Sequence, residues 1–152
     1  MAQVRPFRGL RYFPNTSFEL RDVLCPPYDV ISPASQYLIR QHSPYNAIHV
    51  ELPEGISGEQ YASAAQIMDQ WRREGTLVRD SQPSYYILRH RFEYWGRAWE
   101  RWGLTACVRL EEFHNQVIMP HEETDPGVKE DRLQLMEACK ANLSPIMSLY
   151  QD

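Results

Sequence analysis

The stretch Met119–Tyr150, MPHEETDPGVKEDRLQLMEACKANLSPIMSLY, gathers ionisable residues into a short loop and then begins a helix directly behind them. Asp125 can cap this helix with its side-chain oxygen, and Pro126 suits the first helical position, where a missing N–H costs nothing. We therefore predict a helix over Pro126–Asn142. Its buried stripe, read at helical spacing, consists of Val128, Leu135, Cys139 and Leu143.

Arg132 falls in the middle of this apolar stripe. A guanidinium there must be paired, must reach solvent, or must face an anion. Two alternatives follow. Arg132 either pairs with a carboxylate such as Glu122, or serves an anionic ligand together with Lys129.

The loop before the helix contains the candidate catalytic residues, His121 and Glu122. A helix N-terminus offers unpaired N–H groups and a positive dipole, so with Lys129 and Arg132 nearby it can receive a phosphate. Glu122 or Glu123 can then hold Mg²⁺ or take a proton from a hydroxyl group. The structural alternative is a helix N-terminus whose acidic residues are stabilised by the dipole and by Arg132.

A second candidate lies in the segment CPPYDVIS. Pro26 and Pro27 stiffen the backbone there, so Tyr28 and Asp29 are held on a rigid loop, which we assign as a substrate loop. An ordinary structural turn is the alternative. Ser32 and Pro33 then supply the cap and the first residue of a helix over Pro33–His42.

The remaining segments predict a mixed α+β fold. Ala47–Leu52 alternates like a strand, Ser57–Gly75 has the apolar spacing of a helix, with Ser57 and Gln60 at capping-box distance, and Tyr85–Leu110 is a β-hairpin. Pro145–Tyr150 resumes an apolar pattern that suits a strand. Residues 1–152 should form one domain, with a mixed sheet, a long hairpin and about three helices.

The hairpin places Trp102, Leu104, Ala106, Val108 and Leu110 on one face. Arginines interleaved with aromatic residues can bind single-stranded nucleic acid by stacking. Four glutamates dilute this charge, and they are Glu93, Glu100, Glu111 and Glu112. Because the whole chain has a formal charge of −4, we expect a solvated hairpin face and no nucleic-acid partner.

Several protein classes are disfavoured by the sequence. No apolar run approaches the length of a membrane span, and the start MAQVRPFRG has no signal-peptide core, so we expect a cytoplasmic protein without a membrane partner. Cys25, Cys107 and Cys139 lack the spacing of a zinc or redox site and are expected to be reduced core residues. The usual nucleotide-loop, zinc-protease and hydrolase motifs are absent.

Six segments, in this order, resemble the N-terminal part of a family catalogued as domain of unknown function 1015. They are RPFRGLRY, CPPYDVIS, SPYNAIHVELP, MPHEET, KEDRLQL and KANLSPIMSLY. The resemblance covers nearly all of the chain. It departs from the family at Glu123, where the family usually has a basic residue, and this removes a cation from the expected phosphate site.

Longer members of that family carry an Asp-Gly-His-His-Arg motif, which this chain lacks. The motif is similar to one in free-serine kinases of the ParB/sulfiredoxin-like superfamily. The resemblance therefore implies a ParB/sulfiredoxin-like fold and a nucleotide-dependent small-metabolite phosphotransferase, using Mg²⁺ with ATP or ADP. It implies that this chain alone is an inert, incomplete part, with an exposed sheet edge suited to a homodimer. The alternative is a non-catalytic module that binds a nucleotide or another small ligand.

Overall fold

The computed structural model describes residues 1–14, 18–56, 58–121 and 123–150. It confirms the mixed α+β class, since it contains three helices of ten or more residues and a long β-hairpin. The helices are α1 (Leu20–Val23), α2 (Pro33–His42), α3 (Ile48–Glu51), α4 (Glu59–Arg73) and α5 (Pro126–Cys139), with 3-10 turns η1 (Tyr28–Val30) and η2 (Phe113–Asn115). The strands are β1 (Val4–Arg5), β2 (Leu10–Tyr12), β3 (Leu77–Arg79), β4 (Tyr86–Tyr94), β5 (Arg97–Thr105) and β6 (Cys107–Val108).

The chain forms two compact units. Unit 1 contains residues 1–11 and 79–123, and unit 2 contains residues 12–78 and 124–152. The ParB/sulfiredoxin-like fold and the single domain over residues 1–152 stay predictions. None of the helices in the described ranges is both long enough and apolar enough to cross a membrane.

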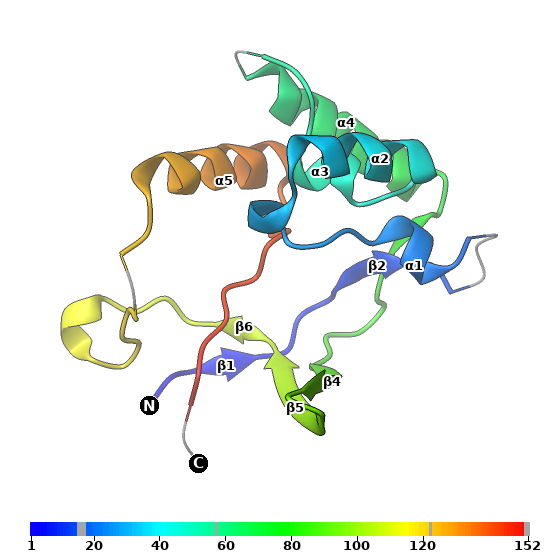
Figure 1. Cartoon of the computed structure of the whole chain (residues 1–152). Helices are drawn as coiled ribbons and strands as arrows, with labels where there is room; N and C mark the ends of the chain where they lie inside the picture. Colours follow the sequence, from blue (N-terminus) through cyan, green and yellow to red (C-terminus); the bar gives the residue numbers. More distant parts are fainter. Residues whose placement is uncertain (15–17, 57, 122, 151–152) are drawn as a thin grey trace. The chain divides into compact units, whose positions relative to one another are not determined.

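Unit 2 holds the apolar core. Helix α4 packs against both α3 and α5, and α2 packs against α3; Figure 1 shows these four helices grouped together. The buried apolar side chains are Val23, Ile48, Val50, Ala64, Met68, Trp71, Leu135 and Cys139. Leu135 and Cys139 belong to the predicted stripe of α5, whereas Val128 at its start is 42% exposed.

The helix starts follow local capping. At α2, Ser32 accepts a hydrogen bond from the Ser35 backbone N–H at 3.2 Å, and Pro33 is the first helical residue, as predicted. At α4, Gly58 is the N-cap, with φ at 92°, and its N–H donates to the Gln60 side chain at 2.9 Å. The predicted cap Ser57 lies outside the described residues.

The predicted strand Ala47–Leu52 is wrong, because residues 48–51 form the short helix α3. Asn46 explains the difference. Its side-chain oxygen accepts from the Ile48 N–H at 3.0 Å, and its side-chain amide donates to the carbonyls of Asp22 and Leu24 at 2.9 and 3.0 Å. Ile48 and Val50 are both buried, so one helical turn produced the alternation that we read as a strand. Over four residues, the side-chain period of 2 in a strand cannot be distinguished from the period of 3.6 in a helix.

Two further predictions about the C-terminal region need correction. Helix α5 ends at Cys139 and not at Asn142, because Lys140 takes a left-handed conformation with φ at 51°. Residues 145–150 form neither strand nor helix. Ile146 and Leu149 are 90% and 91% exposed, and an apolar run forms a strand only where a second strand offers backbone partners.

Unit 1 is built around the hairpin, which confirms the prediction for residues 86–105. The predicted continuation to Leu110 is wrong, because Cys107 and Val108 pair with β1. Strands β4 and β5 pair from Tyr86 with Thr105 to Tyr94 with Arg97. The two-residue turn, Trp95 and Gly96, has φ values of 52° and 68°, the left-handed pair that matches the twist of a hairpin. Two short pairs join β1 to β6 and β2 to β3.

Candidate functional site

The N-terminus of α5 has the predicted cap. Asp125 Oδ1 accepts hydrogen bonds from the N–H groups of Gly127 at 2.7 Å and Val128 at 3.2 Å. Pro126 is the first helical residue. The cap fixes where the helix begins, and with it the position of Arg132 in the second turn.

Arg132 is paired with carboxylates, which is one of the two alternatives that the sequence left open. Its Nε and Nη2 donate to Asp131 Oδ2 at 2.8 and 2.5 Å. Its Nη1 donates to the Glu51 carbonyl at 2.9 Å and lies 3.6 Å from Glu51 Oε1. The Arg132 and Glu51 side chains are only 18% and 15% exposed. Glu122, the partner named from the sequence, lies outside the described residues.

Tyr28 covers one face of this guanidinium. Arg132 Cζ lies 4.4 Å from the centre of the Tyr28 ring, within the range of a cation–π interaction. Tyr28 opens the η1 turn directly after Pro27. The contact therefore brings together one residue of the predicted substrate loop and one of the predicted phosphate-binding residues.

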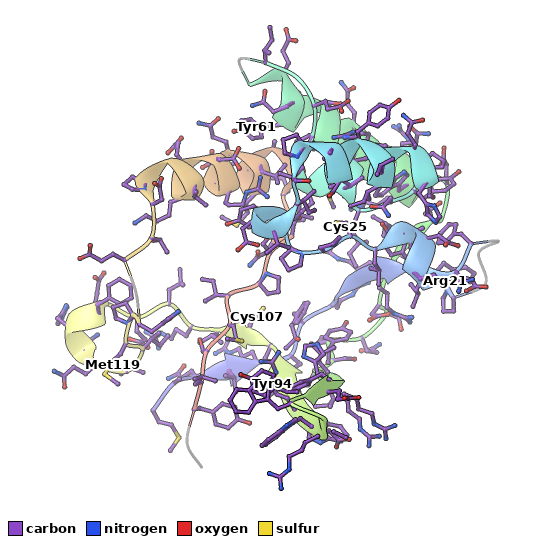
Figure 2. The ribbon with its side chains drawn as sticks, viewed as in Figure 1. Arg21, Cys25, Tyr61, Tyr94, Cys107 and Met119 are labelled. Carbon is purple, nitrogen blue, oxygen red and sulfur yellow. The ribbon has the colours of Figure 1, made fainter. Side chains whose placement is uncertain are left out.

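Two hydroxyl groups complete the cluster. Tyr61, on α4 and labelled in Figure 2, donates from its hydroxyl to Asp131 Oδ1 at 2.7 Å, and this hydrogen bond raises the pKa of Tyr61. Ser144 donates to Glu51 Oε1. We call Tyr28, Glu51, Tyr61, Asp131, Arg132 and Ser144 the Arg132 cluster. With two carboxylates and one guanidinium, its formal charge is −1.

The other predicted site residues are not part of this cluster. Asp29 and Lys129 are exposed residues of unit 2. His121 is exposed and belongs to unit 1, whereas the Arg132 cluster belongs to unit 2. The catalytic assignment of His121 and Glu122 stays a prediction.

Sequence reasoning missed four members of the cluster. Glu51 lies in the segment that we predicted as a strand, and Tyr61 and Asp131 lie in helices that we predicted without giving either residue a role. Ser144 has no predicted role either. The adjacent opposite charges of Asp131 and Arg132 on a partly buried helix were the one sequence signal that could have identified the cluster. The hydrogen bonds to the other members join residues 70 or more positions apart.

The chemistry of the cysteines is limited. Burial raises the pKa of Cys25 and of Cys139 to about 11, so neither thiol is a ready nucleophile at neutral pH. Cys139 is buried as expected, whereas Cys107 is exposed, which corrects its assignment to the core. Among the residues with described positions, no group of three or more metal-binding side chains is close enough to hold an ion.

Comparison with known families places the chain in a family without an assigned function. A family model described as "Protein of unknown function (DUF1015)" matches residues 4–152. No curated protein matches the chain, and no solved structure matches it.

Proposed function

The chain belongs to the DUF1015 family, and on that premise we propose that it is the N-terminal part of a nucleotide-dependent phosphotransferase acting on a small metabolite. The proposal extends the resemblance to the free-serine kinases. In this proposal, catalysis also requires the Asp-Gly-His-His-Arg element of the longer family members.

The observation that carries the proposal is the contact between Arg132 and Tyr28. A guanidinium that is already oriented binds a phosphate with less loss of side-chain entropy than a free one. Three of its five N–H donors are engaged by Asp131 and Glu51, which leaves two for a ligand. The Tyr28 ring, which covers one face of the Arg132 guanidinium, can help to position the ligand beside it.

Two further residues of unit 2 complete the proposed phosphate site. Lys129 lies three residues before Arg132 on α5, so the two side chains are neighbours on the helix surface. Asp131, at 44% exposure, is the most accessible carboxylate of the Arg132 cluster. Nucleotide-bound Mg²⁺ usually takes one or two protein carboxylates. From the sequence alone, His121 and Glu122 stay the predicted acceptors of the metabolite hydroxyl proton, and Asp29 stays the predicted contact to the metabolite.

A second candidate function is favoured by the charge of the Arg132 cluster. Because two carboxylates already balance the guanidinium, the cluster is held together without a ligand. This suits a non-catalytic module that binds a nucleotide or another small ligand and reports its presence.

The test is nucleotide binding by calorimetry, with Mg-ATP and Mg-ADP and with Lys129→Ala as the variant. Lys129 is exposed, so the fold should be unchanged. We expect about tenfold weaker binding, the result of losing one charge-assisted contact of about 1.4 kcal/mol. Arg73→Ala removes another exposed cation of unit 2 and should bind like the unchanged protein.

Absence of nucleotide binding would overturn the phosphotransferase and would leave only a module that binds another small ligand. Binding together with phosphate release by a longer family protein supports the phosphotransferase. Binding without release in that longer protein supports the regulatory module.

A further inference from the structure

The register of the β4–β5 hairpin separates its side chains into two different faces. Directly opposed residues of an antiparallel pair share a face, and alternate pairs point to opposite sides. The pairs His90 with Arg101, Phe92 with Trp99 and Tyr94 with Arg97 therefore lie on one side. We call these six residues the aromatic–arginine face. The glutamates Glu93 and Glu100 lie on the opposite face.

On that opposite face, a carboxylate neutralises the cations. Glu100 accepts from Arg89 Nη2 at 2.6 Å, from Arg91 Nε at 3.3 Å and from Trp102 Nε1 at 2.7 Å. These bonds lower the pKa of Glu100, the Arg89 bond most of all. The opposite face is thus electrostatically satisfied by its own residues.

The aromatic–arginine face has no such compensation. Arg101 contacts the ring nitrogen of His90 at 3.0 Å, and a histidine ring supplies no negative charge. Neither Arg97 nor Arg101 forms an ion pair with a carboxylate of the described residues. The expectation of a diluted charge therefore holds for one face of the hairpin and fails for the other.

The Phe92–Trp99 pair lies between these two cations in the register, and Tyr94 is paired with Arg97. Phe92, Trp99 and Tyr94 are 47%, 50% and 58% exposed. At the turn, Trp95 stacks on Tyr94, with ring centres 5.5 Å apart and planes at 18°. Figure 2 labels Tyr94 in this part of the hairpin. Such a row of flat, half-exposed surfaces suits ligands that are themselves flat and unstacked.

We propose that the aromatic–arginine face binds single-stranded nucleic acid. Its rings would stack on bases, and Arg97 and Arg101 would contact phosphates, the combination used by stacking platforms for single strands. The positive charge of this face complements the negative charge of a nucleic-acid backbone. From the sequence, unit 1 has a formal charge of +2 and unit 2 one of −6, so the basic charge of the chain is concentrated in the unit that holds this face.

The test is fluorescence anisotropy with a labelled twelve-residue oligouridylate, using variants on the two faces of one hairpin. Trp99→Ala and Arg101→Gln should each weaken binding about tenfold. Trp102→Ala and Arg89→Gln, which alter the opposite face, should leave binding unchanged. Trp99→Phe keeps a ring and should restore most of the affinity. Circular dichroism confirms that each variant is folded.

Salt dependence gives a second measurement. Two phosphate contacts to a single strand predict a slope of about −1.4 for the logarithm of affinity against that of salt concentration. Lys129→Ala should not affect oligonucleotide binding, so failure of this proposal and failure of the proposed nucleotide site are distinguishable.

Three results would overturn the proposal. Equal losses for variants of both faces would show that the faces are not distinct. Binding of polyglutamate as tightly as the oligonucleotide would show that charge alone acts and that an acidic polypeptide is the occupant. Self-association without oligonucleotide binding, measured by sedimentation, would assign the face to a second copy of the chain.

Discussion

The largely buried side chain of Arg132 has partners on its own helix and on α3. Asp131 is its neighbour in the chain, and Glu51 contributes both a carbonyl and a carboxylate from α3. Removing one member of a buried ion pair is costly, because the remaining charge keeps its desolvation penalty. Asp131 is 44% exposed, so only Glu51 would bear that penalty in full.

We therefore expect Arg132→Ala to reduce the free energy of unfolding by about 2 kcal/mol, below the range for a fully buried pair. Urea unfolding at neutral pH measures the change. The matched control is Arg72→Ala, because the Arg72–Asp69 pair spans 3.4 Å between side chains that are 47% and 64% exposed. Such a surface pair should contribute less than about 0.5 kcal/mol. Equal effects of the two substitutions would show that the cluster does not stabilise unit 2.

The β4–β5 hairpin depends on its turn. Gly96 has φ at 68°, and nothing lies within 4 Å of the position that a Cβ would occupy. An alanine there would therefore meet no neighbour, and the left-handed backbone is its only penalty. Gly103, in β5, has an ordinary strand conformation with Leu88 at 3.8 Å from such a Cβ.

This contrast predicts that a glycine-to-alanine substitution has opposite effects on the stability of the hairpin at the two positions. Gly96→Ala should destabilise the hairpin by about 1 kcal/mol because of its positive φ. Gly103→Ala should stabilise it by about 0.5 kcal/mol, since glycine inside a strand loses more conformational entropy on folding. The hydrogen-exchange rates of the β4 amides measure the effect of each substitution on the hairpin itself. Loss of protection in Gly103→Ala would contradict the prediction.

The two units differ in how much apolar surface they bury. All eight buried apolar side chains of the described residues belong to unit 2. Unit 1 relies on the hairpin and a short strand pair, and an isolated two-stranded hairpin is only marginally stable in water. Stability should therefore be distributed unevenly along the chain.

We expect amides of α4, such as those of Ala64 and Met68, to exchange slowest, and those of β4 and β5 to exchange at least tenfold faster. Hydrogen exchange followed by mass spectrometry measures this on the whole chain. Repeating it over a range of protein concentrations controls for self-association. Equal protection of β4 and α4 at low concentration would refute the uneven distribution.

Local sequence signals were sufficient wherever the structure depends on neighbours in the chain. Ser32 and Asp125 each cap the helix that follows them by accepting hydrogen bonds from N–H groups two or three residues further along the chain. The two strands of the hairpin, rich in aromatic and β-branched residues, are joined by a two-residue turn. These features can be recognised in a short window because every interaction that defines them lies inside it. The mixed α+β class followed from the same local signals, whereas the family followed from the resemblance of six sequence segments.

Tertiary packing determined α3 and the partners of Arg132. Asn46 selects a helical turn by bonding to carbonyls more than 20 residues away, so no local window over residues 47–52 contains the cause. Glu51 is 81 positions from Arg132, and only the packing of α3 and α5 on α4 makes them neighbours. The apolar pattern shows that such helices bury a face, but which charges meet there depends on contacts between distant segments.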